Sequence, residues 1–175
     1  TDDLEQVLND SEVQLVTVCT PPATHFEYGK SALEHGKNVL IEKPFVANQA
    51  EAKELFALAD AKKLLAMPYQ NRRFDSDYLT LKKVIERGYV GQPLLLESHF
   101  DKYRPDDSLH EGSQVDGQFY GLGVHMLDQI LGLFGKSQTV NYDIRAIQNP
   151  ARAVDDGHET QKFYENLKAN KKKKK

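Results

Sequence analysis

Apolar residues in the first 70 positions follow two different spacings, separated by short polar turns. Continuous apolar runs, bounded by turn-forming residues, occupy 13–19, 37–41 and 64–70. Such runs predict the strands of a parallel sheet, and the first of them is expected to be buried on both faces. Helical spacing of apolar residues is found in the segments 2–9, 24–36 and 49–62. This alternation predicts right-handed βαβ units and the α/β fold class.

Polar residues and glycine predict where these helices begin and end. Thr24 with Glu27, and Asn48 with Glu51, have the three-residue spacing of an N-terminal capping box. Gly36 follows the second helix and can adopt the left-handed conformation that ends a helix. Ala32 and Leu33 of the second helix are expected to face inward, and the third helix carries Ala52, Leu55, Phe56 and Ala59 at helical spacing.

The pattern changes near residue 70. Helices are predicted over 75–88 and 124–134, a loop over 104–118, and more polar strands over 92–103 and 139–148. This mixture is typical of an α+β domain with an open sheet. We therefore expect half of a dinucleotide-binding Rossmann domain over 1–70, followed by a partial second domain over 71–168. The lysine-rich end, 169–175, is interpreted as an appended tail.

Charge and composition exclude several classes of protein. The chain has 175 residues with 23 Lys and Arg against 26 Asp and Glu. Without the five terminal lysines the balance is 18 against 26, a formal charge of −8. An acidic body argues against a nucleic-acid partner. No apolar stretch reaches the roughly 20 residues that span a bilayer, and no signal peptide is recognisable, so a cytoplasmic location is expected.

Cysteine usage agrees with a reducing compartment. The chain has one cysteine, Cys19, which cannot form an internal disulfide. Because Cys19 ends an apolar strand, we interpret it as a small core residue.

Candidate chemistry lies where the predicted strands end. "CTPPATH" (19–25), "IEKPF" (41–45) and "YQNRRF" (69–74) each follow one of the three apolar runs. Ligands of open α/β sheets bind beyond the carboxyl ends of the strands, so these segments are expected at one ligand-binding edge. In "IEKPF", Lys43 can exchange a proton, Glu42 can hold the lysine or line a pocket, and Pro44 can fix the backbone.

Each segment also has a purely structural explanation. The first could be a plain strand–helix turn, the second a surface ion pair, and the third a solvated domain junction. In the last predicted helix, His125 and Asp128 share a face, and His125 could contact a substrate or simply bond to backbone. Asp155 and Asp156 make a poor metal site without further ligands, so a solvated loop is expected and no metal is predicted.

Taken together, four segments resemble the Gfo/Idh/MocA family. They are "VQLVTVCTPPATHFEYGKSALEHGKNVLIEKPF", "QNRRF", "IERGYVGQPLLLESHF" and "YGLGVHMLDQILGLFG". The resemblance implies a partial Rossmann parallel sheet followed by part of an α+β domain with an open antiparallel sheet. It also implies NAD- or NADP-dependent oxidoreduction of a sugar-like small molecule, and a homo-oligomer formed through the C-terminal sheet.

The resemblance also implies roles for single residues. Lys43 would be catalytic and reach both the nicotinamide ribose and the substrate hydroxyl, and His125 would contact the reacting hydroxyl. The residues implied to bind the cofactor are Thr20, Pro21, His25, Glu42, Lys43, Asn71 and Arg72.

Two departures from the family pattern qualify this function. Many members carry an acidic residue four positions before the histidine, and here that position is Gly121. The glycine-rich phosphate loop, G-x-G-x-x-G, is absent from the sequence, so we expect it to lie upstream of Thr1. A dinucleotide-binding regulator without dehydrogenase activity is therefore the alternative function.

Overall fold

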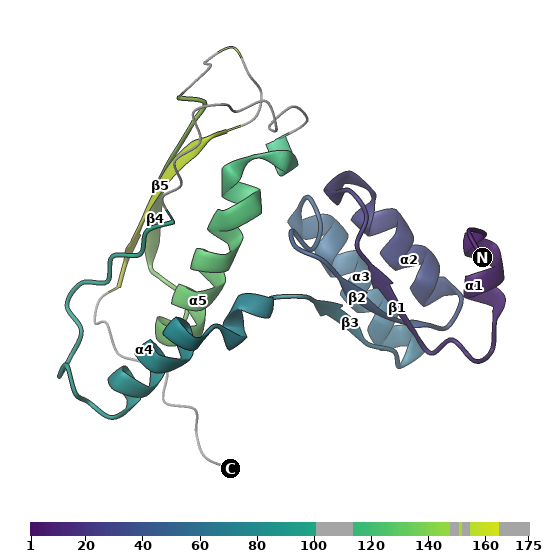
Figure 1. Ribbon diagram of the computed structural model, residues 1–175, viewed down its shortest axis with the longest axis horizontal. Helices are drawn as coiled ribbons and strands as arrows, with labels where there is room; N and C mark the ends of the chain where they lie inside the picture. The colour runs from purple at the N-terminus through teal and green to yellow at the C-terminus, as the bar shows by residue number, and fades with distance from the viewer. Residues whose placement is uncertain (101–113, 148–150, 152–154, 165–175) are drawn as a thin grey trace. The chain divides into compact units, whose positions relative to one another are not determined.

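The computed structural model describes residues 1–100, 114–147, 151 and 155–164, which Figure 1 draws as ribbon. The chain divides into two compact units, Thr1–Tyr69 and Gln70–Lys175. None of the helices in these described ranges is long and apolar enough to cross a membrane.

The first unit is built around a parallel sheet of three short strands. Its elements are α1 (Leu4–Asn9), β1 (Leu15–Val18), η1 (Pro22–Thr24), α2 (His25–Glu34), β2 (Asn38–Ile41), α3 (Gln49–Lys62) and β3 (Ala66–Pro68). The strand order is β1-β2-β3 and both pairings are parallel. The α/β prediction and the partial Rossmann-type sheet are therefore confirmed.

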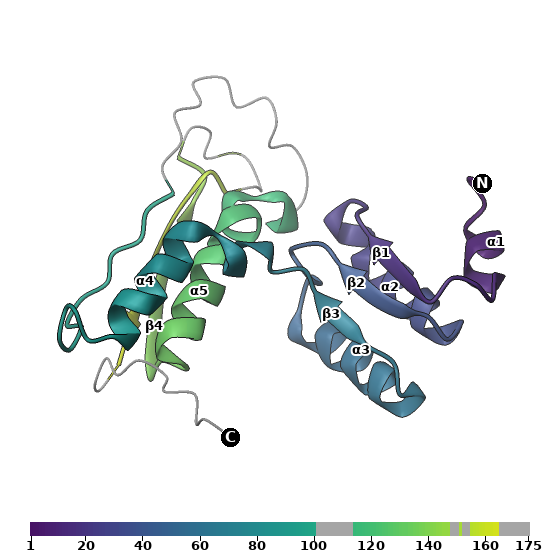
Figure 2. The same cartoon turned by 60° about the horizontal axis from the view of Figure 1, so that its bottom comes forward.

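Helices α2 and α3 pack on the same face of this sheet (Figure 2). The core joins Val18, Val39 and Ile41 of the strands to helix residues that are at most 3% exposed, namely Ala32, Leu33, Leu55 and Ala59. Successive strand residues point to opposite faces, and the opposite face of β1 leaves Leu15 54% exposed. The prediction that 13–19 is buried on both faces is wrong for this chain, and Cys19 is exposed rather than in the core.

The start of α3 and the end of α2 are fixed by the residues that the sequence predicts. The Asn48 side chain accepts a hydrogen bond from the Glu51 backbone N–H at 3.0 Å, which confirms that cap. Gly36 has φ +76°, its N–H donates to the Leu33 carbonyl, and the next N–H donates to the Ala32 carbonyl. This is the Schellman arrangement.

The predicted N-terminal cap of α2 is wrong. Thr24 makes no side-chain cap bond, because its hydroxyl lies 2.8 Å from the Pro21 carbonyl instead. In α3, Phe56 is 41% exposed and stacks on Phe45, with ring centroids 5.2 Å apart.

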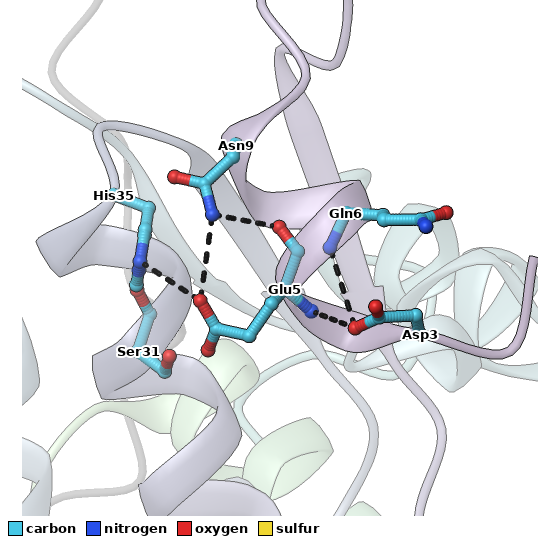
Figure 3. A network of polar contacts seen from close by, with 6 residues as sticks. All are labelled: Asp3, Glu5, Gln6, Asn9, Ser31 and His35. Carbon is cyan, nitrogen blue, oxygen red and sulfur yellow. Dashed lines mark hydrogen bonds and ion pairs between the residues drawn. The ribbon is translucent and has the colours of Figure 1, made fainter.

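Polar contacts attach α1 to the end of α2 (Figure 3). Asp3 caps α1 by accepting from the Glu5 N–H at 2.9 Å, and the Glu5 carboxylate lies 3.8 Å from His35 Nε2. The Lys37 side chain, 7% exposed, donates from Nζ to the Asp10 carbonyl at 2.6 Å. A buried ammonium needs such a partner, so Lys37 fixes where the chain leaves α1.

The second unit combines two helices with an antiparallel ribbon. Its described elements are η2 (Asn71–Phe74), α4 (Ser76–Glu86), η3 (Gln114–Asp116), the π-helical turn η4 (Phe119–Gly123), α5 (Val124–Phe134), β4 (Thr139–Arg145) and β5 (Gly157–Phe163). Strands β4 and β5 pair antiparallel, from Thr139 opposite Phe163 to Arg145 opposite Gly157. Tyr78, Ile85, Leu133 and Phe134 form its core.

Several predictions for the second unit need correction. The helix over 124–134 has the predicted bounds, and strand 139–148 is confirmed as far as Arg145. No strand forms over 92–100, the described part of the strand predicted at 92–103. The loop predicted at 104–118 lies largely outside the described residues. Strand β5 was not predicted, because "GHETQKF" contains a single apolar residue and so lacks apolar alternation.

An ion pair attaches η2 to α5 within the second unit. Arg73 donates from Nε and Nη2 to the two carboxylate oxygens of Asp128, at 2.7 and 2.6 Å. The hydrogen bond from Asp128 raises the pKa of the Arg73 guanidinium above its usual value. The Gln129 amide adds a bond to the Arg72 carbonyl at 3.0 Å. A guanidinium and a carboxylate joined by two parallel hydrogen bonds have one preferred geometry, so this pair fixes the position of η2 on α5.

Helix α2 approaches β2 closely at Gly29, and this contact gives the first prediction. A Cβ at this position would lie 2.6 Å from Ile41 Cδ1, and Ile41 is fully buried. Gly29→Ala should therefore lower the free energy of unfolding by about 1–2 kcal/mol, because overpacking outweighs the gain of about 1 kcal/mol in helix propensity. Urea denaturation of the full-length protein measures this change.

Glu27→Ala is the matched control, because Glu27 is exposed on the same helix. Its effect should stay within about 0.5 kcal/mol. A Gly29→Ala protein as stable as the wild type would contradict the close contact.

The Arg73–Asp128 pair gives the second prediction. In a double-mutant cycle with Arg73→Gln and Asp128→Asn, the two residues should be coupled by about 0.5–1 kcal/mol, since the pair is bidentate but the arginine is largely exposed. The coupling should weaken in 1 M salt. Additive effects of the two substitutions would show that the pair does not hold η2 on α5.

Candidate active site

Strands β1 and β2 end side by side, because they are parallel and pair residue for residue. Their last residues, Val18 and Ile41, lie opposite each other. The Glu42 N–H donates to the Val18 carbonyl at 2.9 Å, so the pairing continues one residue beyond β2. The segments 19–25 and 42–45 therefore start from the same edge of the sheet, the edge at which open α/β folds bind ligands.

Hydrogen bonds within the turn after β1 stabilise its shape. The Thr24 hydroxyl lies 2.8 Å from the Thr20 hydroxyl, and the Thr24 N–H donates to the Pro21 carbonyl at 2.9 Å. Thr20 and Pro21 themselves are exposed. These two predicted cofactor-binding residues thus lie on the surface of a turn whose shape is fixed by internal bonds.

His25, by contrast, is 1% exposed. Its Nδ1 lies 2.7 Å from the Pro44 carbonyl oxygen and its Nε2 lies 2.8 Å from the Thr20 carbonyl oxygen. Both ring nitrogens are therefore used within the protein. This placement favours a structural role, linking the loops after β1 and β2, over the direct contact with a cofactor that the resemblance implied.

The segment after β2 presents Glu42 and Lys43 half-buried and Pro44 buried. The Glu42 carboxylate accepts a hydrogen bond from the Lys43 backbone N–H at 2.9 Å, so one contact of this acid is with the main chain of the lysine. The peptide bond between Lys43 and Pro44 is cis. Glu42 thus shapes the backbone that carries the Lys43 side chain.

Asn71 and Arg72 belong to η2 of the second unit. Asn71 is exposed. Arg72 Nη1 donates to the Asp75 carboxylate at 3.0 Å, and its guanidinium lies 5.1 Å from the centre of the Phe100 ring. Arg72 is 36% exposed in its side chain, so its planar group is oriented by two neighbours and remains accessible.

His125 is the second residue of α5 and is 4% exposed. Asp128, which was predicted to share a helix face with it, is bound by Arg73. Gly121 lies in η4, and no atom of the described residues would lie within 4 Å of a Cβ there. Among these residues there is room for a side chain at the position where many family members carry an acid.

Asp155 has a structural role that the sequence did not indicate. It is 8% exposed, and its carboxylate accepts from the Phe119 N–H at 2.7 Å, at the start of η4. Asp156 accepts from the Ile147 N–H at 2.5 Å. The expected solvated loop is thus wrong for Asp155, which caps a helix end. Asp155 and Phe119 are 36 residues apart in the sequence, so no local pattern could predict this contact.

A polar pocket of about 490 Å³ lies inside the second unit. Its lining includes Gln118, Leu122 and Met126 from the η4–α5 side, and Arg145, His158 and Glu159 from the ribbon. Throughout the described part of the chain, no three His, Cys, Asp or Glu side chains gather where they could hold a metal ion.

Comparisons with known proteins identify the two units. Residues 1–70 match the model of an oxidoreductase family with an NAD-binding Rossmann fold, and residues 78–170 match the GFO/IDH/MocA C-terminal domain. The uncharacterized oxidoreductase YhhX of Escherichia coli is 58% identical over 169 residues, 97% of this chain and 49% of that protein. The scyllo-inositol 2-dehydrogenase (NADP(+)) IolW of Bacillus subtilis is 36% identical over 90% of this chain and 45% of that protein.

A solved structure shows the same fold. The crystal structure of an oxidoreductase from Bacillus cereus has a TM-score of 0.88 and 45% identity, and the match covers 97% of this chain and 48% of that one. The chain thus spans about half the length of the relatives it matches. With both units matched and the parallel sheet and antiparallel ribbon in place, the chain belongs to the Gfo/Idh/MocA family of NAD-binding oxidoreductases.

Proposed function

We propose that the full-length protein transfers hydride between NAD or NADP and a hydroxyl-bearing carbon of a sugar, polyol or related compound. The observation that carries this proposal is the placement of Lys43. It follows β2 at the edge where the Thr20–Thr24 turn follows β1. A family that binds a dinucleotide, and a lysine at the ligand-binding edge of the sheet, together suit proton transfer to or from a hydroxyl.

The residues at this edge fit the nicotinamide end of such a cofactor. When bound, the cofactor supplies the hydride acceptor or donor. Thr20 and Pro21 offer an exposed surface on a turn of fixed shape, and Glu42 and Lys43 are half-buried beside it. Partial burial of these two residues suits a site that excludes some water and still admits a ligand, as ribose binding and proton exchange require.

Lys43 and His125 have the catalytic roles in this proposal. Lys43 takes up or returns the proton of the reacting hydroxyl, and His125 orients that hydroxyl or shares its proton. Asn71 and Arg72 approach cofactor or substrate. The half-exposed guanidinium of Arg72, aimed by Asp75 and Phe100, is the more suitable of the two to hold a polar ligand.

The relatives favour a polyol substrate without identifying one. IolW acts on scyllo-inositol with NADP(+), so cyclic polyols and both cofactors belong in the first substrate screen. A cytoplasmic location and a homo-oligomer formed through the C-terminal sheet stay predictions.

A dinucleotide-binding regulator is the second candidate. Gly121 favours it, because the acid that completes the proton-transfer set in many members is absent at this position. NAD(P)H binding without turnover on any sugar or polyol would support the regulator over the enzyme.

Replacing the two proposed catalytic residues gives the third prediction. In the full-length protein, Lys43→Met and His125→Ala should each lower kcat by about 10²–10⁴-fold, the usual contribution of a proton-transfer group. The Kd of NAD(P)H, measured by fluorescence, should rise only a few-fold for Lys43→Met. Steady-state absorbance at the nicotinamide band measures turnover on a confirmed substrate.

Lys53→Met is the matched control, since Lys53 is an exposed lysine on α3. It should leave both kcat and the Kd unchanged. Full turnover by Lys43→Met would remove the lysine from the mechanism and overturn the proposed function as stated.

A further inference from the structure

One buried ring joins the two loops of the ligand-binding edge. His25 is the first residue of α2, and its ring lies between the Thr20 carbonyl, five residues earlier, and the Pro44 carbonyl, nineteen residues later. The two loops are far apart in the sequence. The ring is 1% exposed, so water does not compete for these two bonds.

The number of donors decides how the ring is held. A carbonyl oxygen only accepts, and a neutral imidazole has a single N–H. The ring therefore donates at least one of the two contacts, of 2.7 Å to Pro44 and 2.8 Å to Thr20.

We propose that His25 is a positioning residue that sets the two halves of the active-site edge with its two ring nitrogens. This inference rests on the proposed function. Nε2 fixes the Thr20 carbonyl and with it the exposed Thr20–Pro21 surface for the cofactor. Nδ1 fixes the Pro44 carbonyl, one peptide bond from Lys43, and so sets the direction of the proposed proton carrier.

Substitutions of His25 can remove its contact with Thr20 and its contact with Pro44 one at a time. The amide nitrogen of asparagine lies near the position of Nδ1, and that of glutamine near the position of Nε2. His25→Asn therefore keeps a donor toward Pro44 and loses the bond to Thr20. His25→Gln keeps a donor toward Thr20 and loses the bond to Pro44.

The fourth prediction is a split between binding and turnover. In the full-length protein, His25→Asn should raise the Kd of NADH about fivefold and change kcat at saturating cofactor by less than twofold. His25→Gln should lower kcat by about tenfold or more, since small displacements of a catalytic group are costly, with the Kd of NADH within about twofold. The readouts are fluorescence titration with NADH and steady-state kinetics.

His35→Asn is the matched control. His35 also places Nδ1 on a backbone carbonyl, that of Ser31 at 2.8 Å, but it is exposed at the end of α2. This variant should leave the Kd and kcat unchanged. Circular dichroism and thermal unfolding verify that all three variants are folded at the assay temperature.

Equal changes in the Kd and kcat in both His25 variants would overturn the proposal. If Lys43→Met keeps full activity while the NADH titrations of the His25 variants behave as expected, the proposed reaction fails and the link between the loops stands.

Discussion

The parallel register between β1 and β2 is the constraint on which the rest of the first unit depends. Leu15 lies opposite Asn38 and Val18 opposite Ile41, so both strands end together. A slip by one residue would turn Val39 and Ile41 out of the core, because alternate residues face opposite sides. The Asn38 amide helps to hold this register, since it donates to the Gln14 carbonyl and accepts from the Leu65 N–H, each at 2.9 Å.

Function follows from this register through the loops. Two strands that end together bring the Thr20 turn and the Lys43 segment to the same edge, and the His25 ring joins them there. Helices α2 and α3 support the edge from one face of the sheet, with Gly29 allowing α2 to approach Ile41. In the second unit, the ion pair between Arg73 and Asp128 fixes the position of η2 on α5, the helix that contains His125.

Local patterns predicted the elements whose cause is local. The apolar runs gave the three parallel strands, and Asn48 and Gly36 marked helix ends because their partners lie within a few residues. Features that depend on residues distant in the sequence were not predicted correctly. Thr24 bonds to the preceding turn instead of capping α2, Asp155 caps a helix 36 residues away, and β5 lacks an apolar pattern. The candidate site residues came mainly from the family resemblance, since no spacing rule separates Lys43 from a surface lysine.

The proposed cofactor site requires that a dinucleotide contacts the loops after β1 and β2. Hydrogen–deuterium exchange of the full-length protein, with and without NADH, measures this at each segment. If the dinucleotide binds at this edge, exchange at residues 19–25 and 42–47 should become slower on binding, with α1 unchanged as an internal reference. Binding of NADH that slows exchange elsewhere and leaves both of these segments unchanged would contradict it.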